Sequence, residues 1–182
     1  YVDIQPTGPS MAVVFDNTIS PLDIGDEYGV FDLSGLISDD CTDQYGELLV
    51  AAGVWPGEDS LTEDRTLSAI RSIDYCSIPD GYQLPGFEVD NLIVIRVWDA
   101  SEGIEYETAI DFQVGDGNFN ETFVVISDLE LLTYGCTDSD ACNYDEGANA
   151  DDGSCVYPEG TCDCNGDPID DFCDCYGTVS YT

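Results

Sequence analysis

The sequence contains no histidine and no lysine, and its only basic side chains are Arg65, Arg71 and Arg96. Without histidine or lysine, the chain cannot form a Ser-His-Asp or Cys-His relay, a Schiff base or a phosphate-binding lysine. A pair of carboxylates, as in glycosidases, is the one hydrolytic mechanism that this composition permits, and no such pair stands out. We therefore expect a protein that is not an enzyme, with a glycosidase as the remote alternative.

Positive charge is scarce relative to negative charge. The 39 acidic residues against three arginines give a formal charge of -36. Nucleic acids and anionic lipid surfaces are bound through basic patches, which this chain lacks. The sequence also has no run of about 18 apolar residues, the length that a membrane helix needs. We expect no nucleic-acid binding and no membrane insertion, and we expect cations as partners because so large a charge repels itself.

The absence of histidine also narrows the role of the nine cysteines. A mixed Cys/His zinc site is impossible, and a four-thiolate site would have to use two Cys-x-Cys pairs instead of the usual Cys-x-x-Cys spacing. Disulfides are therefore the preferred prediction, and they indicate an oxidising, extracellular or cell-surface location. The cysteines concerned are Cys41, Cys76, Cys136, Cys142, Cys155, Cys162, Cys164, Cys173 and Cys175.

The cysteines divide the chain into two regions. Residues 1–134 contain two cysteines, 27 acidic residues and all three arginines, whereas residues 135–182 contain seven cysteines, 12 acidic residues and no basic residue. We predict a β domain over 1–134 and a Cys/Asp-rich, calcium-binding module over 135–182. As the only cysteines of the first region, Cys41 and Cys76 are expected to form a disulfide. The tail pairing stays open, and its odd cysteine count leaves one thiol over for a cysteine elsewhere.

The first region has the pattern of antiparallel β-structure. Residues 104–114 alternate apolar and polar side chains, the two-residue period of a sheet with one wet face. Further candidate strands, separated by turn residues, lie at 10–16, 27–33, 46–55, 91–100 and 122–132. This number of short strands in one region predicts an all-β fold, an antiparallel β-sandwich of Ig-like or jelly-roll type.

Several polar or aromatic residues of this region have candidate structural or functional roles. Arg96 lies inside an apolar strand and is expected to pair with a carboxylate. Trp55 and Trp98 could form a platform for surface glycans, although strand tryptophans more often belong to the core. Asn120 begins an Asn-Glu-Thr sequon and would accept a glycan if the producing cell glycosylates. Five acidic residues are interpreted only as hydrated turn residues: Asp16, Asp23, Asp26, Glu27 and Asp32.

The tail contains two acidic clusters with the spacing of calcium ligands. Residues 163–174 place oxygen-bearing side chains at positions 1, 3, 5, 9 and 12 of an EF-hand-type loop, with Pro168 where that loop has glycine. An ordinary solvated acidic face is the alternative. Because the tail has no apolar stripe, it needs disulfides and calcium to stabilise it. The predicted ligands are Asp163, Asn165, Asp167, Asp171 and Asp174 in this loop, and Asp138, Asp140, Asn143, Asp145, Asn149, Asp151 and Asp152 in the earlier cluster.

The tail also resembles a known kind of repeat. The stretch GCTDSDACNYDEGANADDGSC, residues 135–155, resembles repeats of very large secreted surface proteins, especially of marine Bacteroidota and some giant viruses. Residues 163–174 are similar to thrombospondin type 3 and dockerin calcium repeats. The resemblance implies adhesion, matrix formation or fibre building. We therefore expect a non-catalytic structural or adhesive surface module that binds copies of itself head to tail in filaments, with a carbohydrate-binding module as the alternative.

Overall fold

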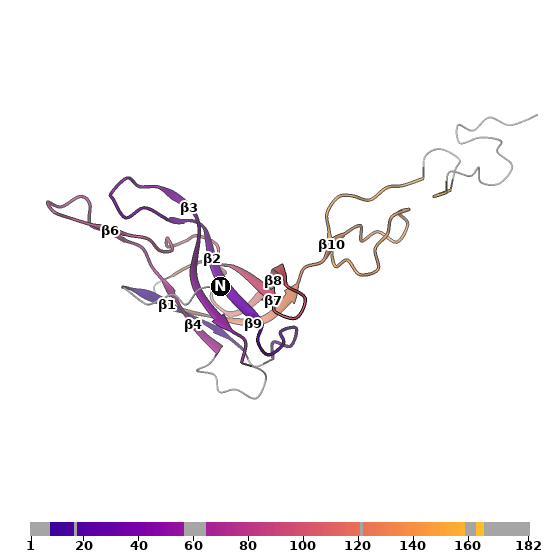
Figure 1. Ribbon diagram of the computed structural model, residues 1–182, viewed down its shortest axis with the longest axis horizontal. Helices are drawn as coiled ribbons and strands as arrows, with labels where there is room; N and C mark the ends of the chain where they lie inside the picture. Colours follow the sequence, from indigo (N-terminus) through magenta and orange to yellow (C-terminus); the bar gives the residue numbers. More distant parts are fainter. Residues whose placement is uncertain (1–7, 17, 57–64, 121, 159–162, 166–182) are drawn as a thin grey trace, which may run out of the picture. The chain divides into compact units, whose positions relative to one another are not determined.

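The computed structural model describes residues 8–16, 18–56, 65–120, 122–158 and 163–165. The chain divides into two units, one that ends at Leu131 and one that begins at Leu132 (Figure 1). The described residues contain no α-helix, and so no helix that is long and apolar enough to cross a membrane. The two units are described separately below.

Eleven strands lie within the described residues. They are β1 (Ser10–Phe15), β2 (Glu27–Leu36), β3 (Tyr45–Val54), β4 (Thr66–Ile70), β5 (Ile73–Asp74), β6 (Gln83–Leu84), β7 (Val94–Asp99), β8 (Ile104–Val114), β9 (Phe123–Leu131), β10 (Tyr134–Gly135) and β11 (Ala150–Asp151). The six strands predicted from the sequence are confirmed as β1, β2, β3, β7, β8 and β9, and the alternating segment 104–114 coincides with β8.

Seven strands of the first unit form one sheet in the order β3-β2-β7-β8-β9-β1-β4. All neighbours are antiparallel except β1 and β9, which run parallel. The two edge strands β3 and β4 approach each other, so the sheet is nearly closed into a barrel. The all-β class is therefore confirmed, whereas a sandwich of Ig-like or jelly-roll type is not confirmed.

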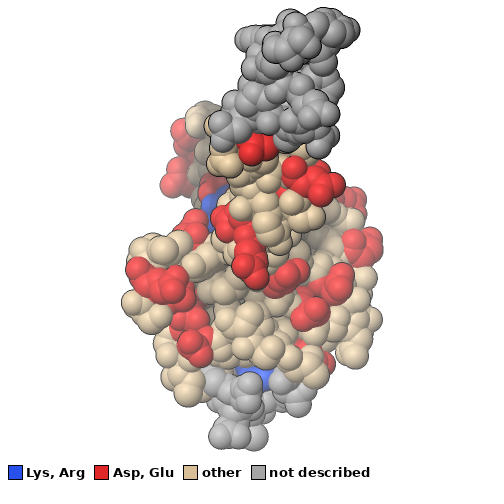
Figure 2. All heavy atoms as spheres, turned by 90° about the vertical axis from the view of Figure 1, so that its right-hand side faces the viewer, with Lys and Arg blue, Asp and Glu red and all other residues tan. Residues whose placement is uncertain are grey.

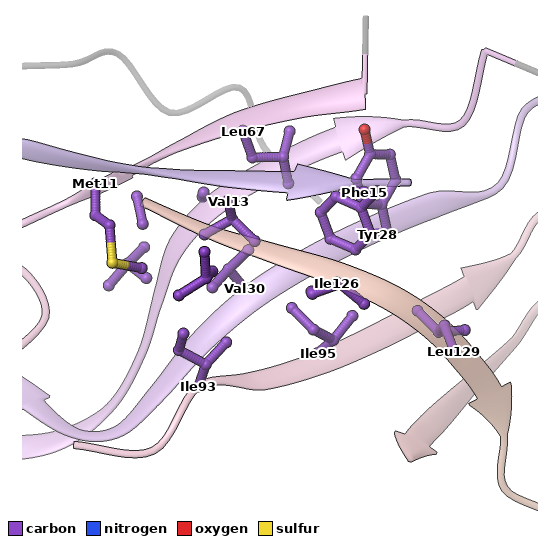
Figure 3. Packing of buried hydrophobic residues seen from close by; sticks show 14 of the residues in the cluster. Met11, Val13, Phe15, Tyr28, Val30, Leu67, Ile93, Ile95, Ile126 and Leu129 are labelled. Atoms are coloured by element: carbon purple, nitrogen blue, oxygen red, sulfur yellow. The ribbon is translucent and has the colours of Figure 1, made fainter. Parts of the chain in front are cut away.

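The interior of this curled sheet is filled by alternate side chains of its strands. Figure 3 shows Val13 of β1, Val30 of β2, Ile95 of β7 and Ile126 of β9 directed into the same apolar cluster. Each of these side chains is at most 2% exposed. Burying one aliphatic side chain stabilises the fold by about 1.5–3 kcal/mol. The inward-facing apolar side chains of the strands therefore supply the main stabilisation of the sheet.

An irregular segment closes one end of the nearly closed sheet. The amide and carbonyl of Gly86 form hydrogen bonds with Leu36 at the end of β2, both 3.0 Å long. The next residue, Phe87, donates to the Ile70 carbonyl at the end of β4 and accepts from the Ser72 amide. Segment 86–87 thus connects strands from opposite halves of the sheet. Its approach is so close that a Cβ on Gly86 would overlap backbone atoms of Arg71 and Ser72.

Trp55 belongs to the core and not to a surface platform. Its side chain is 1% exposed and its ring lies edge-on to Tyr28 at 5.6 Å between centroids. The guanidinium of Arg65 lies 4.8 Å from the Trp55 ring centroid, a cation–π arrangement. The preferred interpretation of Trp55 as a core residue is therefore confirmed, and its ring is not part of an exposed platform.

Two of the five acids interpreted as hydrated turn residues are buried instead. Asp26 is 5% exposed, and its carboxylate accepts hydrogen bonds from the amides of Asp23 and Ala100. Asp32 is 0% exposed and accepts from the Glu88 amide at 2.8 Å and from the Asn91 side chain. The interpretation as hydrated turn residues is wrong for both, because each carboxylate bonds to protein donors instead of water, among them one backbone amide distant in sequence.

Candidate functional site

The second unit is held by two disulfides that cross each other in sequence. Cys136 is bonded to Cys155 and Cys142 to Cys164, with Cα atoms 4.8 and 5.0 Å apart. In the first unit, Cys41 and Cys76 form the predicted disulfide. These six cysteines confirm the preference for disulfides over a thiolate metal site at their positions. The remaining three, Cys162, Cys173 and Cys175, lie outside the described residues.

The predicted calcium ligands of the earlier cluster point to backbone amides. Asp138 accepts from the Asp140 amide at 2.9 Å, Asp145 from the Gly147 amide at 2.9 Å and Asp152 from the Ser154 amide at 2.8 Å. Asp151 accepts from the Gly153 amide at 3.2 Å. Each bond joins residues i and i+2, the geometry of an Asx turn. Each of these carboxylates therefore stabilises a turn in its own loop.

The two asparagines of the cluster connect more distant segments. Asn143 accepts from the Val156 amide at 2.7 Å and donates to the Ser154 carbonyl at 2.8 Å. Asn149 accepts from the Thr133 amide at 2.7 Å, and the Asn149 amide donates back to the Thr133 carbonyl at 3.0 Å. Both side chains thus join loop segments through hydrogen bonds to backbone groups, and the side-chain oxygen of each accepts one of these bonds.

Asp138 has a second partner in the same unit. The Tyr157 hydroxyl donates to its other carboxylate oxygen at 2.6 Å. This bond, followed by the bond from the Asp140 amide, holds the pKa of Asp138 below its usual range, while the same bond raises the pKa of Tyr157. Both oxygens of Asp138 are therefore occupied by donors that favour the charged carboxylate.

The structure does not assemble these residues into a metal cage. Among the described residues, no three Asp, Glu, Cys or His side chains converge as metal ligands would. A calcium ion requires six to eight oxygen ligands at one point. Calcium binding by residues 138–152 therefore stays a prediction.

The second predicted calcium loop is described only at its beginning. Asp163 accepts a hydrogen bond from the Asn165 amide at 2.9 Å, again an i to i+2 bond. The other predicted ligands, Asp167, Asp171 and Asp174, lie outside the described residues. Calcium binding by residues 163–174 therefore stays a prediction.

Short sequence triplets could have indicated that the tail acids stabilise turns, but ligand spacing alone does not take them into account. Asp-x-Gly occurs at 145–147 and 151–153, and Asp-x-Ser at 152–154. Such triplets favour Asx turns because glycine and serine follow a left-handed or tight backbone easily, and Gly153 has a φ of 73°. The same oxygens suit calcium and Asx turns, so ligand spacing did not distinguish the two.

The remaining candidate residues of the first unit lie on its surface. Asn120 accepts from the Thr122 amide at 2.8 Å, so its sequon forms a tight turn. Trp98 is 39% exposed on β7, where it faces Glu27 of β2 and Glu105 of β8 across the strands. Acidic side chains are spread over the visible surface, with little basic area between them (Figure 2).

A shallow depression of 320 Å³ lies beside the buried Asp32. Its lining consists of Asp32, Leu33, Ser34, Asp90, Asn91 and Leu92. Both oxygens of Asp32 are already bonded to Ser34, Glu88 and Asn91. Both oxygens of this carboxylate therefore serve the fold.

Comparisons of the chain with protein-family models, with curated proteins and with solved structures gave no match.

Proposed function

We propose that this protein is a non-catalytic structural or adhesive module of an extracellular surface protein. The observation that carries the proposal is the placement of the three disulfides, which hold loops in both units instead of joining core strands. Loops fixed by disulfides keep their shape outside a reducing compartment, where surface modules act. The strongly negative charge keeps such a module soluble.

The proposal includes association between copies through the unpaired cysteine. Six of the nine cysteines pair among the described residues, which leaves an odd number, so at least one thiol has no partner within this chain. One such thiol per chain can link only two copies, so the disulfide would join modules in pairs, and non-covalent contacts between the pairs would stack them head to tail in a filament. Non-reducing gels of protein secreted into an oxidising compartment should show a dimer band that collapses to monomer on reduction.

A monomer band without reductant contradicts the covalent link. Light scattering in millimolar calcium then tests non-covalent assembly, and a monodisperse monomer there contradicts the filament. Free-thiol titration of the unfolded protein tests the compartment: secreted protein should show no more than three free thiols, and nine would contradict an oxidised module.

Calcium remains part of the proposal, supported by the ligand spacing of residues 163–174. For residues 138–152, whose carboxylates accept hydrogen bonds from backbone amides, calcium binding stays a prediction. Elemental analysis of protein dialysed against micromolar calcium measures the bound metal. Less than one calcium per chain in that experiment contradicts the proposal.

Carbohydrate binding is the second candidate, and Trp98 is the observation that favours it. An exposed indole between two carboxylates can stack on a sugar ring while the carboxylates accept its hydroxyl protons. Binding to a glycan array should be lost in Trp98→Ala and retained in Tyr134→Ala, an exposed aromatic of the other unit. Absence of glycan binding by the intact chain rejects this candidate.

A further inference from the structure

Two loops of the first unit form a rigid pair. The β2–β3 loop and the β5–β6 hairpin extend side by side from the sheet (Figure 1), and the Cys41–Cys76 disulfide joins them. We call residues 37–45 and 74–84 the stapled tip. Its members are far apart in sequence, so the disulfide is what fixes one loop against the other.

A buried polar network holds the two loops together beneath the disulfide. Gln83 is 1% exposed, and it accepts from the Ser38 hydroxyl at 2.9 Å and donates to Asp43 at 2.8 Å. The Gln44 amide donates to the same Ser38 hydroxyl at 3.1 Å. Because each buried polar atom has a specific partner, the network fixes a single arrangement of the loops.

The stapled tip presents large apolar and aromatic side chains to solvent. Tyr45 is 55% exposed, Tyr75 51%, Tyr82 51% and Ile78 56%. Tyr75 and Tyr82 lie edge to face with centroids 5.5 Å apart, so each keeps the other's orientation. Tyrosines held on rigid loops are typical of protein-binding surfaces, because they lose little conformational entropy on binding.

Every charged residue of the stapled tip is acidic. The tip contains no Lys or Arg, and its exposed acids are Asp39, Asp40, Asp43, Asp74 and Asp80. Desolvation, followed by the charges of Glu88, Asp43 and Asp74, raises the pKa of Tyr45, which shows that this ring lies within the acidic field. The tip therefore combines aromatic faces with negative charge on one preorganised surface.

We propose that the stapled tip is a docking surface for a basic protein segment that presents arginine or lysine side chains. A guanidinium can stack on a tyrosine face while a neighbouring aspartate receives its hydrogen bonds. A second copy is a poor occupant of the tip, because the chain has only three basic residues, of which Arg65 is 0% exposed and Arg96 is paired with Glu47. This inference rests on the proposed adhesive function and specifies the chemistry of its partner.

The test uses the full chain, labelled with ¹⁵N, and a synthetic peptide of alternating arginine and glycine. Amide shift changes should concentrate on residues 37–45 and 74–84. Tyr82→Ser should weaken binding about fivefold or more. The matched control is Tyr134→Ser, since both tyrosines are 51% exposed, and this variant should bind like the wild type. Melting curves verify that both variants are folded.

A second peptide, with citrulline in place of arginine, separates charge from shape and should bind much more weakly. Shift changes spread evenly over the acidic surface, equal effects of the two tyrosine variants, or equal binding of the citrulline peptide would each overturn the proposal. Dimerisation abolished by Tyr82→Ser would assign the tip to a second copy, and glycan binding abolished by it would assign the tip to carbohydrate; either result also overturns it. The gel and light-scattering tests do not involve the tip, so failure here leaves the module function standing.

Discussion

Arg96 of β7 and Glu47 of β3 form a two-pronged ion pair across the intervening strand β2, with N–O distances of 2.7 and 2.9 Å. The guanidinium lies 4.7 Å from the ring centroid of Phe31, which belongs to β2. One arginine therefore connects three strands by two hydrogen bonds and a ring contact. The expectation that Arg96 pairs with a carboxylate is confirmed. The partner, Glu47, lies within the strand predicted at 46–55, although the sequence did not identify it as the partner.

Neutralising the carboxylate should weaken the sheet in a pH-dependent manner. The hydrogen bonds from Arg96 lower the pKa of Glu47. A lowered folded-state pKa gives stability that is present above the unfolded value of about 4.3 and is lost as the pH falls through the folded value. Because the pair is partly exposed, Glu47→Gln should cost about 0.5–1 kcal/mol at neutral pH.

Urea unfolding at pH 7 and in acid measures this difference. The difference in unfolding free energy between wild type and Glu47→Gln should shrink as the pH falls below about 4, because the Glu47 carboxylate becomes protonated there. Asp111→Asn removes another carboxylate from the sheet surface and serves as the control. A gap that persists unchanged in acid contradicts the ion-pair explanation.

Gly86→Ala should destabilise the first unit strongly. The new Cβ would overlap backbone atoms of Arg71 and Ser72, which cannot move without breaking the hydrogen bonds of segment 86–87. We expect a loss of about 3 kcal/mol or more, measured by urea unfolding. Gly46→Ala is the control, because its Cβ would meet only the flexible end of Ile37 at 3.3 Å. Equal losses in the two variants would contradict the steric overlap at Gly86.

Removing the buried carboxylate of Asp32 should cost more than removing an exposed one. Asp32→Ala leaves the amides of Ser34 and Glu88 and the side chain of Asn91 without their acceptor. The expected loss is about 3 kcal/mol, since three part-buried donors lose a charged acceptor and the space of the buried carboxylate is left empty. Asp116→Ala, which removes one exposed turn contact, should cost less than about 1 kcal/mol. Thermal or urea unfolding of both variants compares them, and similar losses contradict the network.

Alternation of apolar and polar side chains predicted β8, and apolar runs bounded by turn residues predicted the other five strands. These patterns did not predict the sheet, because the parallel pairing of β1 with β9 and the closure by segment 86–87 join residues far apart in sequence. Asp32 was misread for the same reason: the Glu88 amide that makes its burial tolerable is supplied by tertiary structure. Counting cysteines did identify the Cys41–Cys76 disulfide, since the region offers no other partner.

Ligand spacing in the tail was ambiguous for a chemical reason. An Asp or Asn oxygen accepts an amide proton two residues ahead with the same loop geometry that brings it toward a cation. Asp138, Asp145 and Asn143 satisfy amides in the structure. Spacing therefore indicated an oxygen-rich loop correctly, while the partner of those oxygens needed the three-dimensional structure.

This distinction leads to a prediction for metal removal. Hydrogen exchange of residues 135–156 should be the same in calcium and in EDTA, because Asx turns and the Asn143 and Asn149 bonds hold this segment without metal. Reduction of Cys136–Cys155 and Cys142–Cys164 should instead abolish its protection, since the segment has few buried apolar side chains to stabilise it. Mass spectrometry of exchanged peptides measures both changes in one experiment. Protection that falls in EDTA with the disulfides intact would show that calcium binds these loops after all, whereas an EDTA effect restricted to peptides from 163–174 would assign the metal to the second loop.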